Sequence, residues 1–204
     1  MNVTGEDTVV RRSLVCLLLL IISCVSLFCV IPSEGSEKAT ALNRAILDRS
    51  LELGTDFLIN HQKKEGNFNY EYDWLNRTFT KGDSSVRQAG AAWGLALIYH
   101  EAHDPKVLKA LEKALSFFEG HSRVTRNGER FIDYPGLSEG RTGTVALCAL
   151  AYIELLRSGE EVLGKEKMSC YSDILDGYLK FLLKARDKRG LWHSSYSIRT
   201  GKPY

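Results

Sequence analysis

The sequence predicts an all-α protein built from repeated helical hairpins, preceded by a hydrophobic N-terminal helix. Two observations support this prediction. Amphipathic segments with apolar residues at helical spacing alternate with segments of about 12 residues that are apolar on nearly every side. Phenylalanines near the ends of the amphipathic segments recur at Phe57, Phe117 and Phe181, at separations of 60 and 64 residues. A period of this size indicates a stack of two-helix units.

Three amphipathic helices are expected, over Leu42–Leu58, Val107–Phe118 and Tyr171–Leu183. The last shows the clearest pattern, because its apolar residues follow the i, i+3, i+4, i+7 spacing of one helix face. Asp104 and Pro105 precede the second segment, and Gly120 follows it. A cap residue, a proline at the first helical position and a glycine past the end are typical helix boundaries.

Two further segments, Gln88–Tyr99 and Thr142–Ile153, are rich in alanine and glycine and have no polar face. A helix without a polar face is buried on all sides, and its small residues let neighbouring helices approach closely. Each segment is too short to span a bilayer, which needs about 20 residues. We therefore expect both segments to form core helices, with Arg87 and Arg141 at their starts.

Outer amphipathic helices that surround a ring of apolar inner helices form an α/α toroid. Residues 37–204 are accordingly predicted to be the N-terminal part of such a domain. The third hairpin has its outer helix and its loop, but the chain stops at Tyr204, where the next inner helix should begin. We expect either a domain truncated in its third hairpin or an open arc that closes by self-association.

The first 36 residues are predicted to be a signal anchor or a signal peptide. Arg11 and Arg12 precede an uncharged apolar run at residues 13–31, and Pro32 closes it. The length of the run favours a retained membrane anchor, whereas Ser33 and Gly35 suit cleavage before residue 36. Residues 21–24 loosely resemble a lipoprotein box and residues 11–14 a twin-arginine signal. In each case the remainder is expected to be exported, either membrane-anchored or secreted.

Composition excludes several classes of protein. Of the 204 residues, 44% are hydrophobic and 25% charged, which excludes wholesale disorder. The net charge of +2, without a dense basic stripe, gives no basis for a nucleic-acid partner. Cys148 and Cys170 are the cysteines of the exported part, and neither has zinc-ligand spacing. We predict no metal and no cofactor.

The loops that follow the first and third amphipathic helices share a pattern. Residues 57–68 read FLxxxQxxxGxF and residues 181–192 read FLxxxRxxxGxW. This pattern resembles the QW repeat of the squalene cyclase and prenyltransferase superfamily, with Arg186 in place of Gln and Phe68 in place of Trp. Similar loops occur in pectate lyases and six-hairpin glycosidases. The resemblance implies a toroid, and the glycine and the polar residue are expected to terminate the outer helix.

In a toroid of this type, an active site lies at the N-terminal ends of the inner helices. The loops predicted there combine aromatic rings, carboxylates and arginines, which suit sugar rings and acidic sugars. Asp73 and Asp133 are the candidate acid and base of a glycoside hydrolase. The candidate substrate-binding residues are Tyr70, Tyr72, Arg87, Tyr134, Arg141, Trp192 and His193. Each also has a structural interpretation, as a packing, capping or ion-pairing residue.

Three functions follow as hypotheses. The first is a carbohydrate-active protein of the glycoside hydrolase, polysaccharide lyase or epimerase class, with a carbohydrate ligand. The second is a non-catalytic interaction module or truncated copy, in which an exposed edge of the arc binds a partner. The third is a terpenoid-cyclase-like enzyme, although the aspartate-rich DxDD motif of that class is missing from these 204 residues.

Overall fold

The computed structural model describes residues 43–204, which are mostly helical. The helices are α2 (Arg44–Asn60), α3 (Ser85–Ala102), α4 (Pro105–Gly120), α5 (Thr142–Leu156), α6 (Glu160–Leu163) and α7 (Lys165–Lys184). The predicted hydrophobic helix at 13–31 lies outside the described residues. Among residues 43–204, no helix combines the length and the hydropathy needed to cross a membrane.

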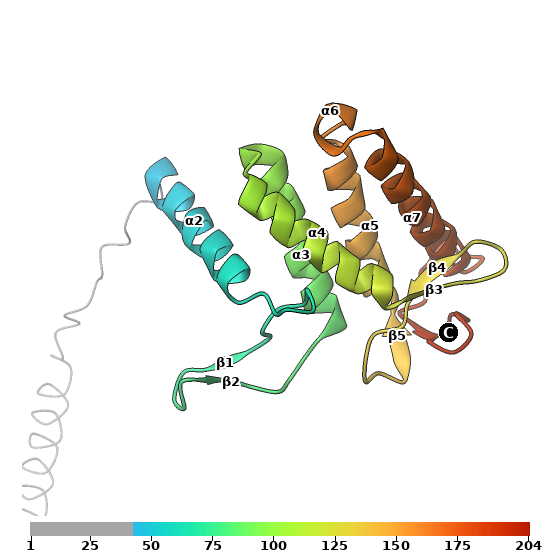
Figure 1. Cartoon of the computed structure of the whole chain (residues 1–204). Helices are drawn as coiled ribbons and strands as arrows, with labels where there is room; N and C mark the ends of the chain where they lie inside the picture. The colour runs from blue at the N-terminus through green and yellow to red at the C-terminus, as the bar shows by residue number, and fades with distance from the viewer. Residues whose placement is uncertain (1–42) are drawn as a thin grey trace, which may run out of the picture. The chain divides into compact units, whose positions relative to one another are not determined.

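The two segments predicted to be buried form the centre of the domain. Helices α3 and α5 pack against each other, α4 packs on α3, and α7 packs on α5 (Figure 1). Ala89, Ala92 and Ala96 of α3 are each fully buried, as is Cys148 of α5. Side chains this small allow the two helix backbones to approach closely. The two helices are central, as predicted, but neither is buried on all sides, because Leu97 of α3 and Leu150 of α5 are more than a third exposed.

Helix α4 begins as the sequence predicts. The Asp104 carboxylate accepts a hydrogen bond of 2.8 Å from the Lys106 backbone N–H, and Pro105 occupies the first turn. Helix α3 ends differently, because His103 rather than a glycine adopts the left-handed conformation, with a φ of 52°. The His103 backbone N–H donates to the Tyr99 carbonyl, which closes the helix.

Helix α2 contributes least to the core. None of its residues is buried, and Leu47, Leu51, Leu53 and Phe57 are all about half exposed. In Figure 1 it stands apart from the other helices of the domain. Its amphipathic pattern therefore formed the predicted helix, but of its apolar side chains only Leu58 and Ile59 pack against the core.

Within residues 43–204, six short strands that the sequence did not predict lie in the segments that follow α2, α4 and α7. They are β1 (Tyr72–Asp73), β2 (Thr78–Phe79), β3 (Ser122–Val124), β4 (Arg130–Ile132), β5 (Glu139–Arg141) and β6 (Ser195–Ser197). They form three antiparallel pairs, β1–β2, β3–β4 and β5–β6. Strands of two or three residues are too short to show an alternating pattern in the sequence.

The three loops that follow the outer helices are built alike. Gly66, Gly128 and Gly190 lie 62 residues apart, and all three have a positive φ. Each turn is closed by a backbone hydrogen bond across four residues. The bonds join Lys63 N to Asn67 O at 2.7 Å, Thr125 N to Glu129 O at 2.9 Å and Asp187 N to Leu191 O at 2.7 Å. The repeat seen in the sequence is therefore also a repeat of backbone geometry.

The polar residue of the loop pattern has a structural role in both copies. The Gln62 side chain donates to the carbonyls of Gly66 at 2.9 Å and Ala110 at 2.8 Å, which links the first loop to α4. The Arg186 guanidinium donates to the Gly190 carbonyl at 3.0 Å. The Gly66 and Gly190 carbonyls in the two turns thus each accept a side-chain hydrogen bond, as the sequence predicts for backbone groups past a helix end.

Candidate functional site

The N-terminal ends of α3 and α5 lie side by side. The hydroxyls of Ser85 and Thr144, both in first turns, are 3.0 Å apart and share a buried hydrogen bond. Neither helix has a side-chain cap, because the N-cap residues Ser84 and Arg141 make no capping hydrogen bond. The Thr142 N–H at the start of α5 donates to the Ser194 carbonyl at 3.0 Å, so what the two helix starts offer an anion in common is the positive end of each helix dipole.

Arg87 lies in the first turn of α3 with its side chain exposed. Its guanidinium carbon lies 5.2 Å from the centre of the Tyr70 ring, within the range of a cation–π contact. Among the described residues, Arg87 forms no salt bridge. The structure thus brings together two predicted site residues and leaves the cation free to bind a carboxylate.

Arg141 immediately precedes α5 and is the centre of a second group of polar contacts. Its guanidinium donates to the Ser195 hydroxyl at 3.0 Å and pairs with the Glu139 carboxylate at 2.9 Å. The Tyr204 hydroxyl donates to the other oxygen of Glu139 at 2.6 Å, and this carboxylate raises the pKa of Tyr204. Ser195 lies 54 residues from Arg141 in the chain, and Tyr204 lies 65 residues from Glu139. Sequence reasoning missed Ser195 and Tyr204 as members of the site because the β5–β6 pairing brings them there.

Tyr134 is buried, and it links the segment after β4 to the segment that leads into α3. Its hydroxyl donates to Asp83 at 2.7 Å, and the other Asp83 oxygen accepts a bond of 2.8 Å from Gln88. Gln88 in turn bonds both the N–H and the carbonyl of Phe68. Burial and the neighbouring Asp83 carboxylate raise the pKa of Tyr134, so its hydroxyl stays protonated. The network fixes the loop in front of α3, and it engages the hydroxyl that was predicted to bind substrate.

Asp73 is the last residue of β1, just before the β1–β2 turn. One carboxylate oxygen accepts the backbone N–H groups of Leu75 and Asn76, and the other accepts the Asn76 side-chain amide at 2.6 Å. These bonds, above all those from Asn76, lower the pKa of Asp73. The neighbouring Tyr72 ring packs edge-on against Phe79, with centroids 5.1 Å apart.

Asp133 follows β4 and forms an ion pair with Arg123, whose Nε donates to it at 2.6 Å. No contact joins Asp133 to Asp73 in the described part of the chain, and the two acids belong to different strand pairs. Each acid thus has local partners of its own. Their catalytic role stays a prediction.

Trp192 and His193 line a groove of about 590 Å³ between α5 and α7. The Trp192 indole N–H donates to the Leu182 carbonyl at 3.1 Å. The guanidinium carbon of Arg186 lies over the Trp192 ring, 5.3 Å from its centre. The rest of the wall is mostly aliphatic. These two residues thus lie apart from the Arg87 cluster, on a largely apolar surface.

Over residues 43–204, no group of three or more His, Cys, Asp or Glu side chains is arranged to hold a metal ion. The polar groups at the starts of α3 and α5 are mainly donors: two guanidiniums, hydroxyls and first-turn N–H groups. Such a set can bind and orient an anionic group.

The fold can be compared with known proteins. No family profile and no curated protein matches the sequence. Two matching solved structures are of a family 10 polysaccharide lyase from Cellvibrio cellulosa. One is a mutant in complex with trigalacturonic acid, with 14% identity, a TM-score of 0.50 and coverage of 74% of this chain and 53% of that chain. The other has 13% identity, a TM-score of 0.51 and coverage of 78% and 56%.

The chain therefore spans about half the length of these structures. At this identity the likeness is one of fold, and it does not transfer residue roles. The mostly helical domain of residues 43–204 shares its fold with part of a carbohydrate-active enzyme.

Proposed function

We propose that this chain binds an acidic polysaccharide at the N-terminal ends of α3 and α5, as part of an α/α-toroid protein of the polysaccharide lyase class. The observation that supports it best is the pairing of Arg87 and Arg141 with two adjacent helix starts that lack side-chain caps. The shared fold with a lyase, one of whose structures contains trigalacturonic acid, points to a uronic acid as the sugar.

The chemistry of a uronate suits this surface. A carboxylate accepts two parallel hydrogen bonds from one guanidinium, and a helix N-terminus adds N–H donors and a favourable dipole. Arg87 is the freer of the two arginines, because Arg141 already pairs with Glu139. We therefore expect Arg87 to contribute more to affinity than Arg141. The Tyr70 ring beside Arg87 offers an apolar face to the sugar.

Elimination fits the described groups better than hydrolysis does. Glycoside hydrolysis needs two carboxyl groups on either side of the bond, and here Asp73 and Asp133 are engaged in local hydrogen bonds and an ion pair. In elimination a base removes the proton beside the uronate carboxylate, a carbon–carbon double bond forms, and the leaving oxygen takes up a proton from an acid or water as its bond to carbon breaks. Guanidiniums that neutralise the carboxylate make that proton easier to remove.

The toroid architecture is part of the proposal. It is supported by the two core helices, by the loop geometry that recurs every 62 residues and by the fold comparison. Export, either as a membrane-anchored or as a secreted protein, rests on the apolar run at residues 13–31, outside the described residues.

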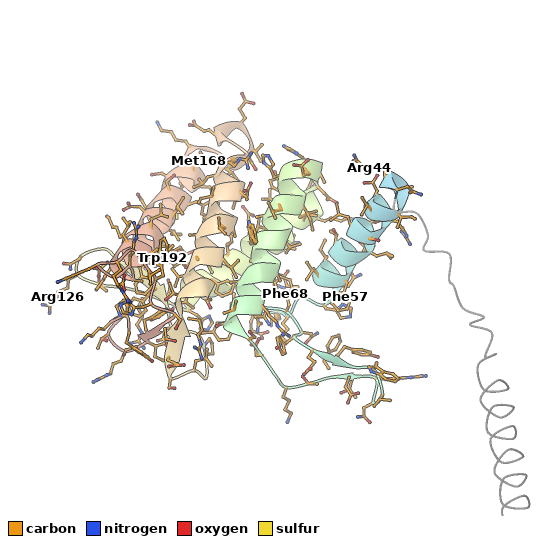
Figure 2. All side chains as sticks on the ribbon, turned by 180° about the vertical axis from the view of Figure 1, so that it is seen from behind. Arg44, Phe57, Phe68, Arg126, Met168 and Trp192 are labelled. Atoms are coloured by element: carbon orange, nitrogen blue, oxygen red, sulfur yellow. The ribbon has the colours of Figure 1, made fainter. Side chains whose placement is uncertain are left out.

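Titration of the full chain with trigalacturonic acid tests the proposal. Binding should weaken as salt increases, and a neutral oligosaccharide of equal length should not bind. Arg87→Gln should weaken binding about 10-fold or more, the value of one charge-assisted hydrogen bond. Arg126→Gln is the matched control, since it removes the same charge from the exposed β3–β4 turn, where Arg126 projects from the domain (Figure 2).

Equal losses in both variants would show that only net charge matters, and the proposed site would be wrong. A separate assay of the unsaturated product, by its ultraviolet absorbance, tests the reaction class. Binding without product would limit the function of this chain to recognition of the polysaccharide.

A further inference from the structure

Four aromatic residues occupy alternate positions in the segment that leads from the first loop into the β1–β2 hairpin. They are Phe68, Tyr70, Tyr72 and Trp74. Their exposure increases along the chain, because Phe68 is 5% exposed, Tyr72 48% and Trp74 75%. Among the large hydrophobic side chains of residues 43–204, that of Trp74 is the most exposed. The row thus begins in the core and ends in solvent.

The inner part of the row lies at the proposed uronate site. The Arg87 guanidinium carbon is 5.2 Å from the centre of the Tyr70 ring, and a Cβ on Gly82 would lie 3.4 Å from the same ring. Tyr70 therefore packs against the segment that leads into α3. In Figure 1 the hairpin projects from the end of the domain at which α3 begins. Because four residues of chain span at most about 14 Å, a polysaccharide bound at Arg87 can extend as far as Trp74.

The hairpin that presents Trp74 is held in place by its own contacts. The Asp73 carboxylate accepts three hydrogen bonds from the two residues that follow Trp74. The Tyr72 ring packs on Phe79 with centroids 5.1 Å apart, and Phe79 packs on His61 at 5.0 Å, which connects the hairpin to the end of α2. A platform that is already ordered loses little conformational entropy when a ligand binds.

We propose that Trp74 stacks on a sugar ring of the same acidic polysaccharide, beyond the uronate held at the two helix starts. The inference rests on the proposed function and adds a second subsite to it. The hairpin offers a ring rather than a net charge, because Glu71 and Asp73 are balanced by Arg77 and Lys81 between residues 70 and 82. An aromatic face packs on the apolar C–H face of a sugar, so this contact is not ionic.

Affinities of the full chain for trigalacturonic and hexagalacturonic acid test the inference. We expect the hexamer to bind more tightly, and Trp74→Ala to remove this gain through a loss of about 3- to 10-fold in affinity for the hexamer. Trp74→Phe keeps a ring and should stay within about 2-fold of the unchanged protein. Leu75→Ala is the matched control, because Leu75 is the next residue of the same turn and is 72% exposed. Its affinity for the hexamer should be unchanged.

Two further measurements distinguish stacking from an effect of charge or of structure. The loss in Trp74→Ala should be the same at low and high salt, whereas the loss in Arg87→Gln should shrink as salt increases. The tryptophan fluorescence of the chain should change when the hexamer binds. This change should disappear in Trp74→Phe, which still binds and which keeps Trp93 and Trp192.

Each alternative result has a definite meaning. An unchanged affinity for the hexamer in Trp74→Ala, together with the expected loss in Arg87→Gln, would overturn the inference and leave the proposed function intact. A loss in Leu75→Ala as large as that in Trp74→Ala would also overturn it, because the turn would then be a general apolar contact. If neither oligomer binds, the proposed function is wrong, and the stacking site is wrong with it.

Discussion

Helices α2 and α4 are the same element in two different environments. Both are amphipathic, and in both a phenylalanine in the last turn stacks on the histidine that follows the helix, with ring centroids 4.3 Å apart for Phe57–His61 and 4.4 Å for Phe117–His121. In both, the histidine Nδ1 lies 2.8 Å from the phenylalanine carbonyl. Yet Phe117 is 7% exposed and Phe57 is 49% exposed.

The difference shows what local sequence decides and what it leaves to neighbours. Periodicity and end residues form the helix and its terminal stack in both copies. Burial depends on whether a core helix covers the apolar face, as α3 covers α4. The same amphipathic pattern therefore contributes more to stability in a covered helix than in α2. Substitutions at equivalent positions should change the free energy of unfolding by different amounts.

The largest contrast is expected at the repeated phenylalanine. Phe181 of α7 is fully buried against Phe131 and Tyr196, at centroid distances of 5.7 and 4.8 Å. Phe181→Ala should lower the free energy of unfolding by about 3–5 kcal/mol, because it leaves a cavity. Phe57→Ala should cost less than about 1 kcal/mol at its half-exposed position. Urea denaturation of both variants measures the difference, and similar losses would refute the unequal burial.

A glycine contrast tests the packing of β5 on β6. A Cβ on Gly140 would lie 2.1 Å from the Tyr196 ring, whose hydroxyl bonds both backbone groups of Ile132. Gly140→Ala should therefore cost about 1–3 kcal/mol of stability through overpacking. Gly143→Ala, three residues later, has no atom within 4 Å of the added carbon and should be neutral or stabilising. Thermal unfolding of the two variants checks this, and an equal effect would argue against the close approach.

The polar residue of the two loops should also differ in importance. Gln62→Ala removes the bond to the Ala110 carbonyl, and with it a link between the first loop and α4. We expect a loss of about 1–2 kcal/mol, because two carbonyls lose a partner. Arg186→Ala removes an exposed contact within its own loop and should cost less than about 0.5 kcal/mol. A larger loss for Arg186 in urea denaturation would reverse the comparison.

The smallest effect concerns pH. Hydrogen bonds from Thr125, and next the neighbouring Lys184, lower the pKa of Glu129 below its ordinary 4.5. A lowered pKa in the folded state means that this stabilisation is complete above about pH 4.5 and is lost as the pH falls through the folded value. Glu129→Gln should remove about 0.5 kcal/mol near neutral pH and flatten the acid slope. Urea denaturation at a series of values from about pH 6 to about pH 3 would measure this pH dependence. The same dependence in the variant as in the unchanged protein would contradict the role given to Glu129.

Much of the fold could be predicted from the sequence, because helices α3, α4, α5 and α7 leave local signals of periodicity and composition. The strands could not, because each has only two or three residues and because the β5–β6 pair joins residues far apart in the chain, such as Glu139 and Ser197. The same limit applies to the site. Arg87 and Arg141 were identified by their positions at helix starts, but Asp83 and Tyr204 bond partners 51 and 65 residues away.

The two candidate catalytic acids illustrate the ambiguity of residue type. Asp73 lies three residues before Asn76 in a turn, a spacing typical of a carboxylate that bonds its own turn. Asp133 pairs with Arg123 through the β3–β4 register, which the sequence did not reveal. From the sequence, an acidic residue in an aromatic loop is equally compatible with a catalytic role and with a role in holding the loop. The hydrogen bonds and ion pairs that show its structural role are visible only in the structure.

One measurement tests the proposed function most directly. Backbone amide resonances of the full chain should be followed by NMR while trigalacturonic acid is added. We predict that the shifts concentrate on the first turns of α3 and α5, at Val86, Arg87, Gly143 and Thr144. Shifts confined to the β1–β2 turn or the α5–α7 leucines, or no shifts at all, would contradict an acidic-sugar site at the two helix starts.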